Sequence, residues 1–404
     1  MLIAMMAAFF GLSLSNIFLR SSMGVLAPEL SAELALSPAM LGATASAFFV
    51  SYALMQLPTG LLLDRYGPRL TVIGLFLLTV IGTFLFAISW SGPMLLTSRL
   101  IMGIGCAGVF SGAFMIIARF YSADRLTSIG GTMNSFAMLG TLLATAPLAA
   151  LVTTVGWRVS FIGFAFIAAA IALLAALTVQ DRPQKVSEQR ESVRDILAGS
   201  WEVIRTPGVL PIASGGIALS AGNTLLGIWG GPYLNDVYGL DEIARGKVLV
   251  FMACGGVFGH FVFGHLARWL NTLKWLIICG SLVIATILGT LAVLTKPSIT
   301  VVSGLLALLG VACSFPTILL AHARAMVPDR LIGRGISTVN TGIMIAIAIM
   351  QIAVGALIGA LTPAGTEGAT PEAYRAAFAF IAVMAVISVG IYTQAPDRPP
   401  HGKR

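Results

Sequence analysis

Charged residues are scarce in this chain, and their scarcity excludes an ordinary soluble fold. Only 10% of the 404 residues are charged, against about 25% in typical soluble domains. Hydrophobic residues make up 57% of the sequence. This composition predicts a membrane protein, with the lipid bilayer as its surroundings.

Reactive and metal-binding groups are also few. The four cysteines lie inside apolar segments without a CxxC pair or metal-ligand spacing, so we interpret them as packing residues. The sequence contains no Walker phosphate loop, nucleophile elbow or metal-binding cluster. We therefore expect no enzymatic activity, no cofactor and no metal site.

Long apolar runs occupy most of the chain. Runs of at least ~18 residues, the length of a membrane-crossing helix, occur twelve times. They cover residues 2–28, 38–63, 69–89, 93–118, 127–154, 158–180, 208–235, 243–266, 273–294, 298–322, 332–361 and 374–393. Transmembrane barrels show weak alternation instead of unbroken runs. The predicted fold class is an all-α membrane protein with twelve transmembrane helices.

Lysine and arginine are concentrated on one side of the predicted membrane. With the N-terminus in the cytoplasm, the cytoplasmic loops and tail hold seventeen of them and the periplasmic loops hold five. Because positively charged loops stay in the cytoplasm, we expect both termini on the cytoplasmic side of a bacterial-type inner membrane. The same bias accounts for the net charge of +8 without a nucleic-acid partner.

A hydrophilic segment divides the apolar runs into six and six. We expect a six-helix bundle at 1–180, a cytoplasmic linker at 181–207, a second bundle at 208–393 and a cytoplasmic tail at 394–404. The linker contains VRDILAGSWEVI, which is either a short amphipathic helix on the membrane surface or a solvated connector.

The two predicted bundles share sequence. ARFYSADRLTSIGGT at 118–132 matches ARAMVPDRLIGRGIS at 323–337 at an offset of 205, and an offset of 204 pairs Pro28 with Pro232. An even number of helices in each copy makes the repeat parallel. In transporters built this way the substrate binds between the halves near the middle of the membrane.

The turn between the second and third runs reads GLLLDRYGPRL, residues 60–70. Gly60 permits close helix contact, and Gly67 permits a tight turn. Asp64 can accept hydrogen bonds from Arg65, Arg69 or a neighbouring helix N-terminus. Such a network would hold the two halves together on the cytoplasmic side. A plain positively charged turn explains the arginines but not the spacing.

This G-xxx-D-R-x-G-x-R spacing resembles the cytoplasmic signature of the major facilitator superfamily of secondary transporters. The resemblance implies a fold of two six-helix halves and alternating access by a rocker-switch motion. The second copy, GHLARWLNTLK at 264–274, keeps Gly264 but has Arg268 where Asp64 would map. A symmetric gate is therefore not expected from it.

Arg99 is one of two cations that no loop explains. It begins RLIMGIGCAG, residues 99–108, which resembles the Arg-xxx-Gly-x-Gly pattern of proton-coupled members, where this arginine is associated with coupling. The alternatives are that Arg99 extends to the membrane interface and that the glycines allow close packing. ATAPLAA at 144–150 matches the drug-antiporter signature weakly, and we interpret it as a proline kink.

Buried carboxylates are missing from the predicted helix centres. All sixteen Asp and Glu residues fall in loops or at helix ends, with Glu29 and Glu33 among those outside. A cationic cavity without a buried acid suits an anionic ligand better than a cationic drug.

Arg20 is the second cation that no loop explains. Ser13, Asn16 and Arg20 share one face of the first helix, and FLRSSMGVLAPEL resembles the first helix of the organophosphate and organic-anion branches. The resemblance implies that Arg20 binds the anionic group of the substrate. Arg20 maps onto Thr224, whereas organophosphate exchangers carry a second arginine there, so a carboxylate or smaller anion is favoured over a phosphate ester.

Other polar residues inside the runs are candidates for the cavity wall. Each is equally able to form a hydrogen bond between helices. They are Tyr52, Gln56, Ser220, Asn223, Thr224, Trp229, Asn340 and Gln351. His260, the one histidine more than a turn inside a run, is a candidate for proton coupling, and its alternative is a neutral side chain satisfied by a neighbouring helix.

Taken with the resemblance, these features predict a monomeric secondary transporter of a small organic anion, coupled to protons or a counter-anion. One alternative is a proton-coupled exporter of drugs or metabolites. Another is a membrane sensor that kept the transporter fold. The expected partners are an anionic small molecule and the bilayer, and no nucleic acid.

Overall fold

The computed structural model describes residues 2–120, 123–179, 193–328, 331–363, 366 and 368–397. Within these ranges the regular structure is helical and contains no strand. Ten of the helices are long and apolar enough to cross a membrane. The predicted all-α membrane fold is therefore confirmed.

The helices before the linker form the first half of the molecule. They are α1 (Leu2–Ser21), α2 (Met23–Leu34), α3 (Pro38–Ala87), α4 (Gly92–Cys106), α5 (Val109–Phe120), α6 (Ala123–Leu143) and α7 (Ala146–Thr178). The linker contains α8 (Val193–Arg205). The second half contains α9 (Val209–Thr224), the π-helix η1 (Leu225–Trp229), α10 (Gly230–Tyr238), α11 (Glu242–Trp269), α12 (Lys274–Val293), α13 (Ile299–Ala312), α14 (Pro316–Met326), α15 (Ile332–Leu361) and α16 (Pro371–Tyr392).

Two of these helices contain a turn between successive spans. α3 has 50 residues, about 75 Å at ~1.5 Å per residue, whereas the apolar core of a bilayer is ~30 Å thick. Its path turns at Gly67, where φ is 79°, a conformation that glycine adopts without a side-chain clash. Gly156 makes the same kind of turn in α7. Because α3 and α7 each turn from one span into the next, the ten membrane-crossing helices cover the twelve predicted spans.

Irregularities interrupt several spans in mid-course. α6 ends at Leu143 and α7 begins at Ala146, with Pro147 in its first turn, as expected for a proline kink. The first span is broken between α1 and α2, and the seventh contains η1.

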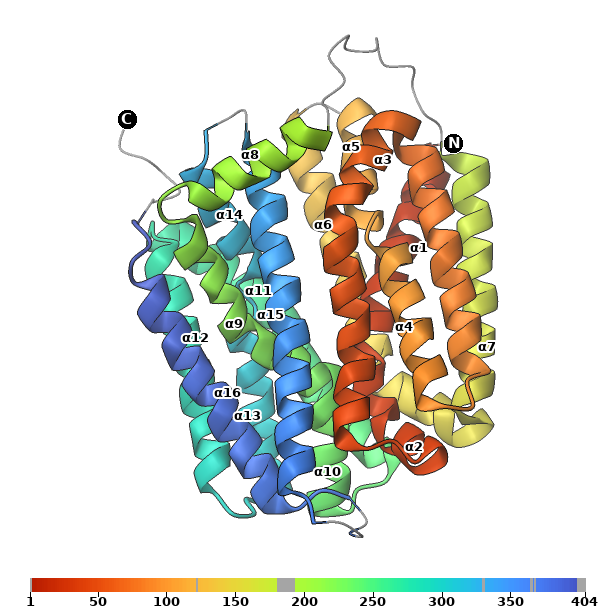
Figure 1. The fold of residues 1–404 in the computed structure, drawn as a ribbon, viewed down its shortest axis with the longest axis vertical. Helices are drawn as coiled ribbons and strands as arrows, with labels where there is room; N and C mark the ends of the chain where they lie inside the picture. Colours follow the sequence, from red (N-terminus) through yellow and green to blue (C-terminus); the bar gives the residue numbers. More distant parts are fainter. Residues whose placement is uncertain are drawn as a thin grey trace.

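The two halves lie side by side, as Figure 1 shows. α1 and α3 to α7 are on one side, α9 and α11 to α16 are on the other, and α8 crosses one end of the molecule. We call this the α8 end, and the opposite end, where α2 and α10 lie, the α10 end (Figure 1). α8 packs on α15, since the Arg334 guanidinium fills the place of a Cβ at Gly199.

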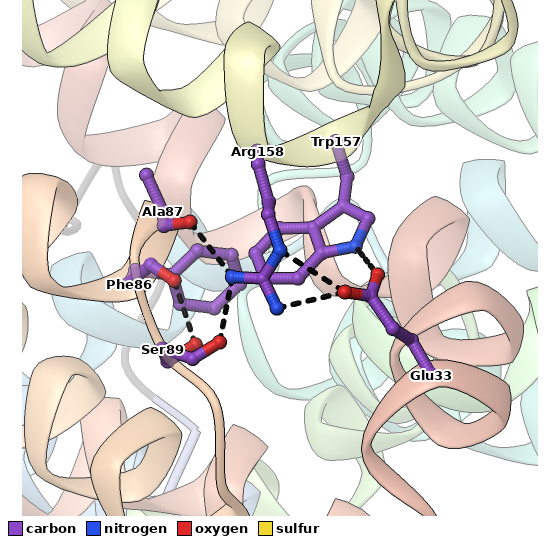
Figure 2. A network of polar contacts seen from close by, with 6 residues as sticks. All are labelled: Glu33, Phe86, Ala87, Ser89, Trp157 and Arg158. Atoms are coloured by element: carbon purple, nitrogen blue, oxygen red, sulfur yellow. Dashed lines mark hydrogen bonds and ion pairs between the residues drawn. The ribbon is translucent and has the colours of Figure 1, made fainter.

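A polar network at the α10 end ties three helices of the first half together (Figure 2). Glu33 of α2 accepts hydrogen bonds from the Trp157 indole (2.5 Å) and from Nε and Nη2 of Arg158 (3.0 and 2.7 Å). Nη1 of Arg158 donates to the carbonyls of Ala87 (3.1 Å) and Ser89 (2.6 Å), where α3 ends.

The second half contains a matching network. Asp236 of α10 accepts from the Tyr374 hydroxyl at 2.7 Å. The next residue, Arg375, donates to the carbonyls of Ala292 (2.7 Å) and Val293 (3.2 Å), where α12 ends. In each half a carboxylate, an aromatic donor and an adjacent arginine join the equivalent three spans, so the duplication read from the sequence is visible in the contacts. For the repeated segments 118–132 and 323–337, the side chains of 117–128 and residues 329–330 lie outside the described part.

Candidate functional site

The first span is interrupted at Ser22, two residues after Arg20. Ser22 N–H still donates to the Phe18 carbonyl at 2.9 Å, and Leu26 N–H donates to Ser22 at 3.4 Å. Ser22 itself is a turn residue that belongs to neither helix. Arg20 therefore lies in the last turn of α1, at a break in the middle of the bundle.

Arg99 of α4 completes the broken end of α1. Its Nη1 donates to the Leu19 carbonyl at 2.7 Å, and the Ser22 hydroxyl donates to the same oxygen at 3.2 Å. Arg99 is only 1% exposed, and its guanidinium lies 4.9 Å from the Phe48 ring centroid. In the described part of the chain its Nε and Nη2 have no partner. The side chain is thus directed at α1, and the alternative in which it extends to the membrane interface is wrong.

Arg20 reaches from the first half to the second. Its guanidinium lies 5.3 Å from the Phe49 ring centroid and 6.0 Å from that of Tyr52, both on α3. Nη2 lies 3.7 Å from the Met344 sulfur on α15. Among the described residues no carboxylate pairs with Arg20. A partly buried cation without a counter-charge is thus held between the halves.

The first-half candidates gather around this cation. Tyr52 is buried, and its hydroxyl lies beside the side-chain amides of Gln56 and Asn16. Asn16 Nδ2 donates to the Cys106 carbonyl of α4 at 3.0 Å. Ser13 is fully buried, and neither its Oγ nor Asn16 Oδ1 has a partner among the described residues. The polar face of the first helix therefore points into the bundle.

Residues of the second half approach the same break. A Cβ on Gly227 of η1 would lie 3.7 Å from both the Arg20 carbonyl and Gln351 Nε2. Gln351 Nε2 donates to the Asn223 carbonyl at 3.4 Å. Asn340 precedes Met344 by four residues on α15, which places it on the face that contacts Arg20.

Three polar atoms of this second-half group are buried without a partner in the described residues. They are Gln351 Oε1, Trp229 Nε1 and Thr224 Oγ1. Buried polar atoms are usually hydrogen-bonded, so an acceptor, a donor and a hydroxyl are available here. Together they can recognise hydroxyl groups on a ligand.

Two of the predicted residues are engaged within their own helices. The Ser220 hydroxyl donates to the Ile217 carbonyl at 2.6 Å. His260 Nδ1 lies 2.8 Å from the Gly256 carbonyl, one turn earlier in α11. His260 Nδ1 is therefore satisfied by its own helix and not by a neighbouring one, and a coupling role for His260 stays a prediction.

The signature turn at 60–70 lies at the α8 end. Gly67 forms the predicted tight turn, and Arg69 Nη2 donates to the Ala176 carbonyl near the end of α7 at 2.8 Å. Arg65 lies over the ring of Tyr66, and Asp64 is exposed. No atom lies within 4 Å of a Cβ on Gly60, so the close helix contact expected there is not made in this conformation.

The halves approach most closely at the α10 end. A Cβ on Gly24 of α2 would overlap the Leu226 carbonyl, and one on Gly231 of α10 would overlap the Gly24 carbonyl. Only glycine permits the two broken helices to pack with their backbones in contact. This end of the interface between the halves is therefore closed.

An ion pair between the halves was missed by the sequence interpretation. Arg245 at the start of α11 is 2% exposed, and its Nη2 donates to Glu29 Oε1 of α2. Its Nη1 donates to Asn235 Oδ1 at 2.7 Å. The sequence analysis placed Glu29 outside the helix centres and counted Arg245 among the five cations of the periplasmic loops. The sequence signal that could have indicated this pair is the position of Glu29. It directly follows Pro28 in the segment GVLAPEL, where the offset of 204 matches the second half.

Duplicated helical halves with a cation held between them define a polytopic membrane transporter. The family model described as "Major Facilitator Superfamily" matches residues 2–326. The chain belongs to that superfamily, which confirms the resemblance seen in its signature turn. It is a multi-pass transporter and not an enzyme.

Several curated relatives are organic-anion transporters by name. The chain is 31% identical over 168 residues to the probable sulfoacetate transporter of Cupriavidus necator, covering 42% of this chain and 39% of that one. It is 27% identical to the probable L-galactonate transporter of Escherichia coli, covering 66% and 61%. It is 23% identical to the hexuronate transporter of Bacillus subtilis, covering 68% and 67%. The first two matches span less than two thirds of those relatives' lengths.

Solved structures match almost the whole chain. One is the bacterial homolog of the human lysosomal transporter Spinster in an inward-facing and unoccupied conformation. It has a TM-score of 0.80 at 19% identity and covers 97% of this chain and 96% of that one. At this identity the likeness establishes the fold.

Proposed function

We propose that this protein is a secondary transporter of a small organic anion that carries a carboxylate or a similar acid group. The observation that carries the proposal is Arg20, a partly buried cation at a helix break between the halves, with no carboxylate partner among the described residues. An unpaired cation within a membrane protein is costly. An anionic substrate would supply the missing charge.

The neighbouring residues suggest how such a substrate is oriented. Arg20 binds the acid group, with Tyr52, Gln56 and Asn16 around it in the first half. Trp229, Gln351 and Thr224 offer hydrogen bonds to the rest of the molecule from the second half. Thr224 in place of a second arginine favours a singly charged group over a phosphate ester. The names of the relatives, sulfoacetate, galactonate and hexuronate transporters, support a small polar anion.

Transport would follow from rocking of the halves about this site. The Lys and Arg bias in the sequence predicts that the α8 end is cytoplasmic. The α10 end is then periplasmic, and the closed contact at Gly24 and Gly231 corresponds to a state shut toward the periplasm. Asp64, Arg65 and Arg69 would join the halves at the α8 end when the motion reverses. Protons or a counter-anion would supply the driving force.

Counterflow in proteoliposomes tests the anion site. Losing a charge-assisted hydrogen bond of this kind costs about 1.5–3 kcal/mol, so Arg20→Ala should weaken binding of galactonate or sulfoacetate roughly 10- to 100-fold. Lys247→Ala, which removes an exposed cation, is the matched control and should leave exchange unchanged. Equal exchange by Arg20→Ala and the parent protein would overturn the proposal.

A further inference from the structure

The Glu29–Arg245 pair is placed where the two halves must separate. Glu29 belongs to α2 of the first half, and Arg245 belongs to α11 of the second. Their side chains are 18% and 2% exposed. Opening the α10 end would pull these helices apart, so the pair must break in every transport cycle. This inference rests on the alternating access proposed above.

Only one of the two Glu29 carboxylate oxygens has a hydrogen-bond partner among the described residues. Arg245 occupies Oε1, while Oε2 is buried and has no hydrogen-bond partner in the described part of the chain. A protonated carboxyl group carries its hydrogen on one oxygen, and Oε2 is free to take it. On the other side of the pair, Arg245 has one further acceptor, the neutral side chain of Asn235.

Burial is the largest influence on the Glu29 carboxyl group and favours its protonated form, whereas the charge of Arg245 favours the ionised form. Glu242 of α11 also acts on Glu29, with the opposite sign to Arg245. Asp236 of α10 is held by Tyr374 and Asn235. On the other elements in contact with α2, the charged side chains are engaged elsewhere or distant, and η1 has none. Arg158 of α7 is bonded to Glu33, and Arg20 of α1 is directed at Met344. The charged residues of α3 lie at the α8 end; they are Asp64, Arg65 and Arg69.

We propose that Glu29 is a proton-binding site whose ionised form holds the α10 end closed and whose protonated form releases it. Neutralising Glu29 would leave Arg245 buried without a counter-charge, which is strongly unfavourable. Opening hydrates Arg245 and relieves that cost. Acid on this side therefore shifts the protein toward the conformation that is open at the α10 end.

Spin-label distances on the full chain in nanodiscs test this directly. The four native cysteines are replaced by serine, and Trp90→Cys and Thr295→Cys place labels at exposed sites, one in each half at the α10 end. The ratio of open to closed states is measured between pH 8 and pH 5, without substrate. A single titrating group changes this ratio by at most about tenfold per pH unit.

Two variants, compared with the parent, make the expected result specific. The parent should shift toward longer distances on acidification, and Glu29→Gln should show the long distance at every pH. Glu33→Gln is the matched control, since Glu33 lies one turn further along α2 but pairs within its own half. It should keep the shift of the parent. A parent population that does not change with pH, or a Glu29→Gln variant that retains the shift, overturns the proposal.

Anion binding separates this inference from the proposed function. Thermal shifts with galactonate and sulfoacetate are recorded for the parent and Glu29→Gln. Binding by both proteins without a pH-dependent distance supports the anion site and overturns the Glu29 proton site. A pH-dependent distance that is lost in Glu29→Gln supports the proton site even if neither anion binds, and in that case the proposed substrate class fails alone.

Discussion

Arg99 donates to the carbonyl oxygen of Leu19 across 2.7 Å, one residue before Arg20. This contact fixes the backbone from which the Arg20 side chain leaves α1. The sequence resemblance associates Arg99 with proton coupling, and that role stays a prediction. Its geometry indicates a positioning role, since its charged side chain binds a carbonyl in the last turn of α1.

The two roles of Arg99 predict different kinetics. If Arg99 positions Arg20, Arg99→Met should weaken anion binding several-fold, because losing a hydrogen bond from a charged donor costs about 1.5–3 kcal/mol and only part of that loss reaches the anion. Arg99→Lys should restore part of the binding. The pH dependence of exchange should stay that of the parent. Dissociation constants by tryptophan fluorescence and exchange rates at several pH values check this. An unchanged affinity with a lost pH dependence would favour coupling instead.

Recognition of the uncharged part of the substrate is predicted to depend on Gln351. Its Oε1 is buried without a partner in the described residues, so a substrate hydroxyl can donate to it. Gln351→Leu should weaken binding of galactonate, which has hydroxyl groups, roughly fivefold. Sulfoacetate, which has none, should be affected much less. Competition assays against both anions measure the difference.

Ser220→Ala provides the control for that comparison. The Ser220 hydroxyl is already bonded to the Ile217 carbonyl, so its loss should leave both affinities unchanged. Equal loss of the two anions in Gln351→Leu would show that Gln351 acts through helix packing and not through a substrate hydroxyl.

The closed α10 end is predicted to depend on Gly24. Because a Cβ there would overlap the Leu226 carbonyl, Gly24→Ala should shift the protein toward states open at this end. Gly60→Ala adds the same methyl group where nothing lies within 4 Å, and it should leave the populations nearly unchanged. Spin-label distances between residues 90 and 295 report both variants. A Gly24→Ala population equal to that of the parent contradicts the prediction.

Much of the fold was predictable because membrane insertion is encoded locally. Unbroken apolar runs located the spans. Gly67 indicated a turn, because glycine readily adopts the positive φ that other residues avoid. Arg20 stood out because a cation inside an apolar run needs a compensating partner. These features depend on a residue and its near neighbours.

The rest depends on contacts between distant segments. Glu29 and Arg245 are 216 positions apart, and each reads as a solvated loop charge until the halves are packed together. The partner of Arg99 is a backbone carbonyl, which carries no sequence signature. Gly60 makes no close contact because the molecule is closed at the α10 end and not at the α8 end. One sequence encodes both conformations, so the sequence does not show which end is closed.

The network in Figure 2 predicts a pH dependence of stability that is separate from transport. Glu33 lies beyond the first membrane-spanning segment, and hydrogen bonds from Trp157 and then Arg158 lower the pKa of its carboxyl group. Since the folded pKa is below the unfolded value, this stabilisation is present above the unfolded pKa, about 4.3, and is lost as the pH falls through the folded pKa. Thermal unfolding in detergent between pH 3 and pH 7 should therefore show a loss of stability in acid.

Glu33→Gln should reduce that loss, and Trp157→Phe should do so in part. The Arg375→Gln variant changes the matching network of the second half and should keep the acid dependence of the parent; the same slope in Glu33→Gln as in the parent would assign the dependence to another carboxylate.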